Sequence, residues 1–216
     1  MRVKSTGLLI DGEVGQLELR VLDASQGKSD PNSDKGKNAQ KWVVISHPHP
    51  EFGGTMDNKV VTTMERFFQA QGYCTVTYNF RGVGQSVGRY DGGAGEQLDL
   101  QAVVDWVRNR ESFESLILAG FSFGAYVTLA AQPAIFADHL LIVAPPVGLY
   151  DFSALEEVHV PWNMVVGLED EVINAKEMLD WALARQLKPS LYCRSEASHF
   201  FHGQLIWLKK TLKSLY

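Results

Sequence analysis

The stretch LILAGFSFGA, residues 116–125, decides the fold of this chain. It begins with the apolar run LILA, which is typical of a buried strand, and it continues into a segment with helical character. Between them, Ser122 lies two residues after Gly120 and two residues before Gly124. Glycines permit a sharp strand-to-helix turn, and such a turn exposes a serine hydroxyl at the carboxyl end of the strand. We therefore predict a nucleophilic Ser122, although a serine that only caps the helix would fit the same pattern.

Strands and helices alternate on both sides of this stretch. Such alternation is typical of βαβ crossovers and predicts an α/β fold, with a mostly parallel sheet and helices on both faces. Residues 7–22 predict an antiparallel hairpin at one edge of the sheet, and the polar residues 25–41 predict a long loop. We expect one domain over residues 1–216 with eight strands. Further strands are predicted at 42–46, 73–80, 115–120, 139–146, 160–167 and 190–196, and helices at 58–72, 95–110, 123–132, 174–187 and 200–216.

The amino-acid composition is that of an ordinary globular protein, and it argues against some kinds of binding partner. The 216 residues carry a net charge of −5, with 45% apolar and 21% charged residues, which argues against a nucleic-acid binder. The apolar run at residues 8–10 is too short for a signal peptide, and no run is long enough to span a bilayer. We expect a cytoplasmic protein with no membrane partner, in which Cys74 and Cys193 are reduced core thiols. The sequence leaves open whether the chain forms a homo-oligomer.

A serine hydroxyl is a weak nucleophile and needs a base, normally a histidine that a carboxylate orients. His199 is the candidate base, because it follows the last predicted strand at the sheet edge where Ser122 emerges. His202 is the rival, but we expect it in the first turn of the closing helix. His139 and His159 stand at strand starts, which lie on the opposite edge, so we interpret them as structural or solvent-facing.

The carboxylate that orients the base should follow the predicted strand at 160–167. Asp170 comes a few residues after the end of that strand, where a loop can turn back toward the histidine. Its neighbours Glu169 and Glu171 are rivals for this role. We predict Asp170 as the third catalytic residue.

The tetrahedral intermediate of acyl transfer carries a negative oxygen that two backbone N–H groups usually stabilise. One donor should be the N–H of Phe123, directly after the serine. The second should come from HPHPEFGGTMDN, residues 47–58, where we favour His49 and then Glu51 or Phe52. The H-x-H pair in this stretch could bind a metal, but no third ligand is apparent. We predict neither a metal nor a cofactor.

Five segments together carry a resemblance that covers nearly the whole chain. The chain resembles the lidless, dienelactone-hydrolase-like bacterial serine hydrolases of the α/β-hydrolase fold, with serine in place of the cysteine that dienelactone hydrolases carry. The resemblance implies Ser122, Asp170 and His199 as a catalytic triad, an eight-stranded sheet, and hydrolysis of esters or related acyl compounds. The segments are HPHPEFGGTMDNKVV (47–61), NFRGVGQSVG (79–88), GFSFGA (120–125), GLEDEV (167–172) and SHFFHG (198–203).

One connecting segment is too short to form a cap domain over the site. Only residues 147–159 separate the two strands between which related enzymes insert a helical cap. We therefore expect an open site, shaped by Phe52, Phe121, Phe123 and Tyr150, which suits small acyl groups.

The expected function is cleavage of small carboxylic esters through an acyl-enzyme. An acyltransferase, thioesterase or peptidase on the same scaffold, or a binding protein without catalysis, would share most of these features. In the glycine-rich stretch at 79–88, we expect Arg81 to tie the loop to a carboxylate, with contact to an anionic substrate as the alternative.

Overall fold

The computed structural model describes residues 7–24, 40–110 and 113–216, and within them it forms one sheet of eight strands. The strand order is β1-β2-β4-β3-β5-β6-β7-β8. All strands from β3 onward run parallel to one another, and β1 and β2 add the predicted antiparallel edge. The strands are β1 Leu8–Gly12, β2 Gly15–Leu22, β3 Gln40–Ser46, β4 Cys74–Tyr78, β5 Phe113–Phe121, β6 His139–Val143, β7 Trp162–Gly167 and β8 Ser190–Arg194.

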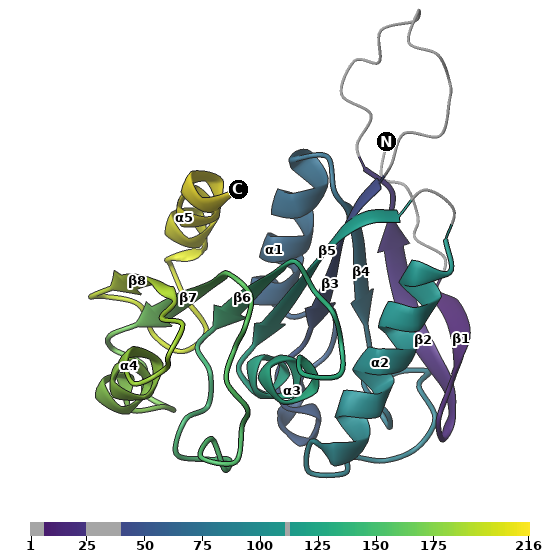
Figure 1. The fold of residues 1–216 in the computed structure, drawn as a ribbon, viewed down its shortest axis with the longest axis horizontal. Helices are drawn as coiled ribbons and strands as arrows, with labels where there is room; N and C mark the ends of the chain where they lie inside the picture. The colour runs from purple at the N-terminus through teal and green to yellow at the C-terminus, as the bar shows by residue number, and fades with distance from the viewer. Residues whose placement is uncertain (1–6, 25–39, 111–112) are drawn as a thin grey trace, which may run out of the picture.

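Within the described residues, five α-helices cover the two faces of the sheet (Figure 1). Two of them pack against each other on one face, and the other three lie on the opposite face. The first pair is α1 Lys59–Ala70 and α5 Leu205–Leu215, and the second group is α2 Ala94–Arg108, α3 Phe123–Ala131 and α4 Ala175–Leu183. This is the predicted α/β architecture.

Two apolar cores separate the sheet from its helices. Successive residues of a strand point to opposite faces. Val44 and Leu118 accordingly join the core under α2, α3 and α4, whereas Val43 and Ile45 join the core under α1 and α5. Because both faces are covered, the central strands consist of continuous apolar runs. Parallel strands also end at one common edge, so the residues that follow β3, β5, β7 and β8 gather there.

The closing helix begins later than predicted. Residues 200–204 form turns, and α5 starts only at Leu205. Phe201 has a φ of 53° and Gly203 a φ of 71°, and both values belong to the left-handed region that ends right-handed helical geometry. His202 therefore lies in a turn before the helix and not in its first turn.

Two smaller predictions are also wrong. β3 starts at Gln40, inside the predicted polar loop, and the remaining loop residues 25–39 lie outside the described part of the chain. Cys74 is buried in β4, but Cys193 is exposed. Cys193 belongs to β8, which among the described residues pairs only with β7, at the end of the sheet, and is only partly buried.

Candidate active site

Ser122 occupies a strained turn between β5 and α3. Its φ of 53° and ψ of −120° lie outside the regions that residues with a side chain usually adopt. The surroundings hold the turn, because Ser122 N–H donates to Val143 O of β6 at 2.9 Å. A Cβ at Gly120 would lie 2.3 Å from Gly124 O, and one at Gly124 would lie 2.4 Å from Ser46 O, so the turn requires both glycines.

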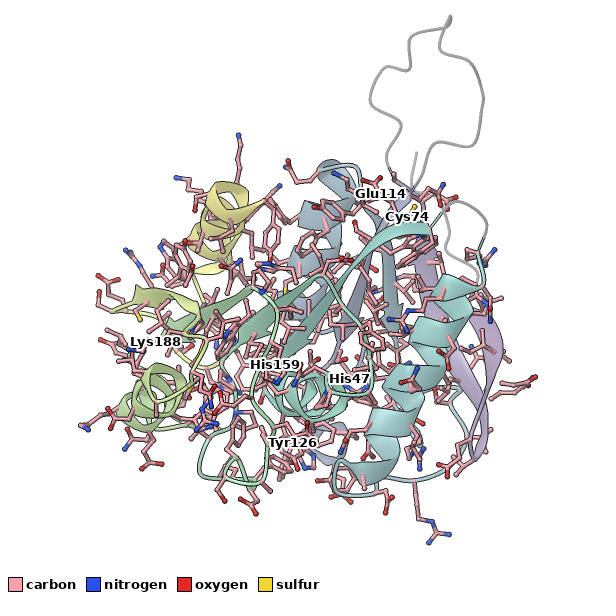
Figure 2. All side chains as sticks on the ribbon, in the orientation of Figure 1. His47, Cys74, Glu114, Tyr126, His159 and Lys188 are labelled. Atoms are coloured by element: carbon pink, nitrogen blue, oxygen red, sulfur yellow. The ribbon has the colours of Figure 1, made fainter. Side chains whose placement is uncertain are left out.

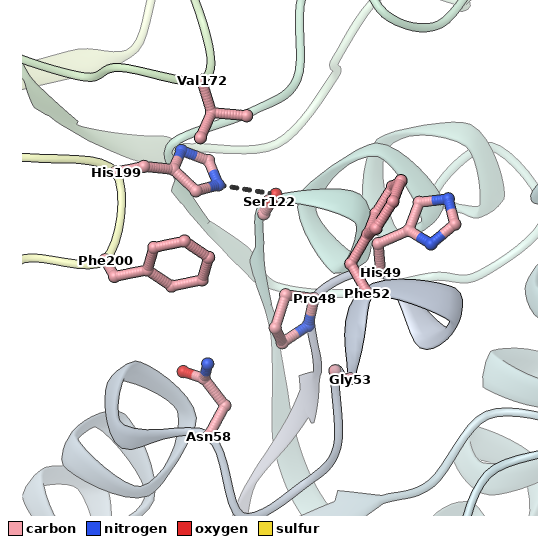
Figure 3. A pocket seen from close by; sticks show the side chains of 10 residues that line it. Pro48, His49, Phe52, Gly53, Asn58, Ser122, Val172, His199 and Phe200 are labelled. Carbon is pink, nitrogen blue, oxygen red and sulfur yellow. Dashed lines mark hydrogen bonds between the residues drawn. The ribbon is translucent and has the colours of Figure 1, made fainter.

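The Ser122 side chain makes no capping hydrogen bond to α3. The alternative of a serine that only caps the helix is therefore not seen. The hydroxyl instead faces His199, as Figure 3 shows.

Asp170, His199 and Ser122 form one continuous line of hydrogen bonds. His199 Nδ1–H donates to Asp170 Oδ2 at 2.7 Å, and His199 Nε2 lies 2.9 Å from Ser122 Oγ. Both residues behind the serine are buried, because only 2% of the His199 side chain and none of the Asp170 side chain is exposed. The carboxylate determines which imidazole nitrogen carries the proton, so Nε2 is left to accept the serine proton.

The loop after β7 holds the carboxylate in place. Asp170 Oδ1 accepts the N–H groups of Val172 and Ile173 at 2.9 and 2.7 Å, which leaves Oδ2 for the histidine. The rival Glu171 has a different contact, because its Oε2 accepts the backbone N–H of His199 at 3.0 Å. Adjacent carboxylates of one loop thus bind the imidazole ring and the backbone of the same histidine.

His47, at the end of β3, is fully buried and uses both ring nitrogens. Nδ1–H donates to Pro48 O at 2.6 Å, and Nε2 accepts the N–H of Phe80, the second residue after β4, at 3.0 Å. Burial lowers the pKa of His47 to about 4, so the imidazole is neutral at pH 7. His47 is labelled near the centre of the view in Figure 2, and its side chain is fully buried. The residue connects the start of the loop after β3 to the neighbouring strand, a role that the sequence analysis missed.

The loop after β3 presents one unoccupied N–H near the serine. A short 3-10 helix, η1 Pro50–Phe52, was not predicted, and it engages two of the three candidate donors. Glu51 N–H donates to His49 Nδ1 at 3.2 Å, and Phe52 N–H donates to His49 O at 3.2 Å. Among the described residues, neither the N–H of His49 nor that of Phe123 has an acceptor. The His49 and Phe123 rings pack with their centroids 5.2 Å apart, so the two backbone segments are neighbours.

A cavity of about 380 Å³ opens beside Ser122. Figure 3 shows His199 and Phe200 on one side of the serine and Phe52 on the other, with Asn58 farther along the cavity. Phe52 is 87% exposed at the rim. Of the aromatic residues that we expected to shape the site, Phe52 alone has its side chain in the lining. Phe200 also lines the cavity, although we expected it in the closing helix. Because α5 starts only at Leu205, Phe200 lies in a turn and faces the serine.

The other expected aromatic residues support the site from behind. Phe121 is buried under the His199 ring, with the ring centroids 5.3 Å apart. Phe123 is buried against Tyr90 and Tyr150, whose hydroxyls lie 3.2 Å apart. These aromatic side chains therefore support the turn at Ser122 and the His199 ring, and they do not form the cavity wall.

Arg81 ties the glycine-rich loop to a helix, as expected. Its guanidinium binds the buried carboxylate of Asp99 in α2 at 2.9 Å and Glu13 at 3.0 Å. Arg81 is not among the residues that line the cavity beside Ser122, so the structural interpretation of Arg81 holds. Asp99 could have been suspected in the sequence only as a polar residue on a largely apolar helix face.

Two of the remaining histidines lie outside the hydrogen-bonded line of Asp170, His199 and Ser122. His139 Nε2 accepts a hydrogen bond from Asn163 Nδ2 at 2.8 Å, and the same amide group donates to the hydroxyl of the C-terminal Tyr216 at 3.2 Å. Burial lowers the pKa of His139. His202 donates its backbone N–H to Ser198 Oγ and contacts the Phe200 ring, so it does not reach the serine.

The described residues, 7–24, 40–110 and 113–216, contain no group of three or more His, Cys, Asp or Glu side chains that could hold a metal ion. None of their helices is both long and apolar enough to cross a bilayer.

Comparison with known proteins identifies the family. The sequence model of the family described as X-Pro dipeptidyl-peptidase (S15 family) matches residues 24–155. An uncharacterized protein of Rickettsia prowazekii is 35% identical over 206 residues, which cover 90% of this chain and 81% of that protein.

Two solved structures agree with this chain over almost their whole length. One is an α/β serine hydrolase without a lid from Xanthomonas campestris, with 38% identity and a TM-score of 0.87, covering 99% of this chain and 94% of that one. The other is an α/β serine hydrolase homologue from Coxiella burnetii, with 40% identity and a TM-score of 0.86, covering 98% of each chain. This chain therefore belongs to the S15-type α/β-hydrolase family and is a hydrolase of the lidless α/β serine hydrolase type.

Proposed function

We propose that this protein cleaves small carboxylic esters and related acyl compounds, with Ser122 as nucleophile, His199 as base and Asp170 as the group that orients the base. The observation that carries the proposal is the hydrogen-bonded line from Asp170 Oδ2 through His199 to Ser122 Oγ, with distances of 2.7 and 2.9 Å. A serine held at a strained turn, with a buried histidine and carboxylate behind it, is the arrangement that activates a hydroxyl.

In the proposed reaction, His199 Nε2 takes the proton of Ser122 as Oγ attacks the carbonyl carbon. The carbonyl oxygen becomes negative beside the free N–H groups of Phe123 and His49, which stabilise it. His199 then gives its proton to the leaving alcohol, and the acyl group remains on Ser122 as an ester. A water molecule that His199 deprotonates attacks this ester, which releases the acid and restores the hydroxyl.

The lining of the cavity suits ester substrates better than peptide substrates with a free N-terminus. The family name mentions a dipeptidyl-peptidase, and such a substrate would bring a terminal ammonium group within two residues of the scissile bond. No Asp or Glu is among the ten residues that line the cavity, and burying an unpaired ammonium is costly. The apolar walls, which include Pro48, Val172 and Phe200, suit an uncharged acyl group. The open rim suits short chains.

Turnover of p-nitrophenyl esters from acetate to palmitate, compared with a dipeptidyl p-nitroanilide, tests the proposal. We expect the highest kcat/KM for short acyl chains and little cleavage of the anilide. The Ser122→Ala variant should lose at least about a thousandfold in kcat while its far-ultraviolet circular dichroism is unchanged.

A fluorophosphonate probe provides a second measurement, because it labels only an activated serine. We expect labelling of the wild type and of Ser153→Ala, a control at an exposed hydroxyl that bonds Asp151. Ser122→Ala should not be labelled. Equal labelling or equal turnover in the wild type and Ser122→Ala would overturn the assignment.

A further inference from the structure

The cavity beside Ser122 contains a polar side chain, that of Asn58, which the proposed reaction does not use. Its walls are largely apolar, and its polar members are Ser122, His199, His49 and Asn58. The His49 ring is engaged, because Nδ1 accepts the Glu51 N–H and the ring packs against aromatic neighbours. The Asn58 amide lines the same cavity and has no role in the proposed reaction.

The helix cap determines how the Asn58 amide is oriented. Asn58 is the N-cap of α1, and its Oδ1 accepts the Val60 N–H at 2.8 Å. The opposite orientation would place an NH₂ group against an N–H donor and would lose the cap. The oxygen is therefore committed to the helix, and the Nδ2 hydrogens remain as donors. Figure 3 shows this nitrogen turned toward the space beside Phe200, at the opposite end of the cavity from Ser122.

The character of the surface changes at Asn58. A second hollow of about 440 Å³ shares Gly53, Asn58 and Phe200 with the cavity, so the two adjoin. Its further lining is mostly polar and includes Thr55, Lys59, His202 and Asp57, whose carboxylate is bound by Arg20. A substrate that extends from Ser122 past Phe200 thus leaves apolar walls and meets the amide donor at the boundary.

We propose that Asn58 is a specificity-determining residue, whose Nδ2–H donates a hydrogen bond to a second oxygen of the substrate, separated from the scissile carbonyl by a short apolar spacer. The substrate class is an ester that carries a keto, ether or further ester oxygen on its acyl chain or on its alcohol. This inference rests on the proposed function, because the position of Ser122 defines where the scissile carbonyl lies. A hydrocarbon at this point would leave the amide donor without an acceptor, which disfavours such substrates.

Matched ester pairs test the inference. On the acyl side, p-nitrophenyl 4-oxopentanoate is compared with 4-methylpentanoate, and 5-oxohexanoate with 5-methylhexanoate. On the alcohol side, 2-methoxyethyl acetate is compared with butyl acetate. The readout is the ratio of kcat/KM within each pair, measured for the wild type and for variants of Asn58, so that intrinsic differences in ester reactivity cancel.

Two variants separate the donor from the helix cap. Asn58→Asp and Asn58→Ser both keep an oxygen that can cap α1, but neither keeps the amide donor. We expect the oxygen-bearing ester of one pair to lose about tenfold relative to its partner in both variants. Asn174→Asp is the matched control, because Asn174 caps α4 by the same side-chain contact, to Lys176 N–H at 3.0 Å, and lies outside the cavity lining. It should leave every ratio unchanged.

The pair that responds tells which side of the substrate reaches Asn58. Ratios that are the same in the wild type and in both Asn58 variants, for all three pairs, would overturn this inference while esterase activity stands. Absence of ester turnover and of fluorophosphonate labelling in the wild type would instead overturn the proposed function on which it rests.

Discussion

Acid should destabilise this protein through His47, whose imidazole fulfils its role only in the neutral form. In the native fold Nε2 accepts the Phe80 N–H, and burial lowers the pKa of His47 from its usual 6.5 to about 4. In the unfolded chain the pKa returns to its usual value, so between these two values the unfolded state binds a proton that the native state does not. The stabilisation by neutral His47 is therefore complete above pH 6.5 and is lost as the pH falls toward 4.

The magnitude follows from the two pKa values. The interval from 6.5 to about 4, at about 1.4 kcal/mol for each pH unit, sets a limit of about 3.5 kcal/mol of unfolding free energy. About 3 kcal/mol of this is lost by pH 4, where the native His47 is itself half protonated. Domains are typically stable by about 5–15 kcal/mol. This single buried histidine should therefore remove a substantial part of the stability over the acidic range.

Urea unfolding followed by tryptophan fluorescence, at pH steps from 7 to 4, measures the effect. The comparison is with His47→Gln, because a glutamine Oε1 can accept the Phe80 N–H but does not titrate. Carboxylates and His139 titrate in both proteins and cancel in the difference. We expect wild type to lose about 3 kcal/mol more than His47→Gln between pH 6.5 and 4. Two curves that remain parallel over this range would refute the neutral, buried role of His47.

Two further predictions concern the base and the C-terminus. Glu171→Ala should lower kcat/KM for esters about tenfold, because the His199 backbone N–H loses its acceptor. Glu171→Gln keeps an oxygen there and should retain most of the activity. Steady-state kinetics of both variants measures this, and equal losses in the two variants would contradict it. Tyr216→Phe should lower the unfolding free energy by about 1 kcal/mol, because the Asn163 amide loses an acceptor; urea unfolding measures it, and an unchanged midpoint would count against the contact.

Much of the fold could be predicted from local sequence patterns, because each element carries its own signal. Continuous apolar runs identified the central strands, since both faces of the sheet are covered. The positions of Ser122, Asp170 and His199 after three different strands were enough to expect them at one sheet edge, and the structure brings their side chains together.

What the sequence analysis missed depends on contacts between distant segments. His47 and Phe80 are 33 residues apart, and nothing local in either segment indicates that a backbone N–H will meet an imidazole. The role of Glu171 depends on which way the loop after β7 turns, which two adjacent carboxylates do not reveal. The exposure of Cys193 follows from the place of β8 at the end of the sheet, and residue pattern alone does not give strand order.

The late start of α5 has a local cause, and part of this cause could be predicted from the sequence. Gly203 is a residue that favours the left-handed region, and it stands where the helix was expected to have begun. Phe201 adopts the same region without being glycine, and its burial in the core, not its intrinsic preference, holds it there. Phe200 is consequently free to face the cavity.

The proposed site draws its groups from separate parts of the chain. The segment between β3 and α1 would hold the carbonyl oxygen and the far end of the substrate. The segments after β7 and β8 would supply the carboxylate and the base, and they add Val172 and Phe200 to the cavity wall. Selection, or an engineer, can therefore reshape substrate preference at Phe52 and Asn58 without changing the carboxylate and the histidine that would make the serine reactive.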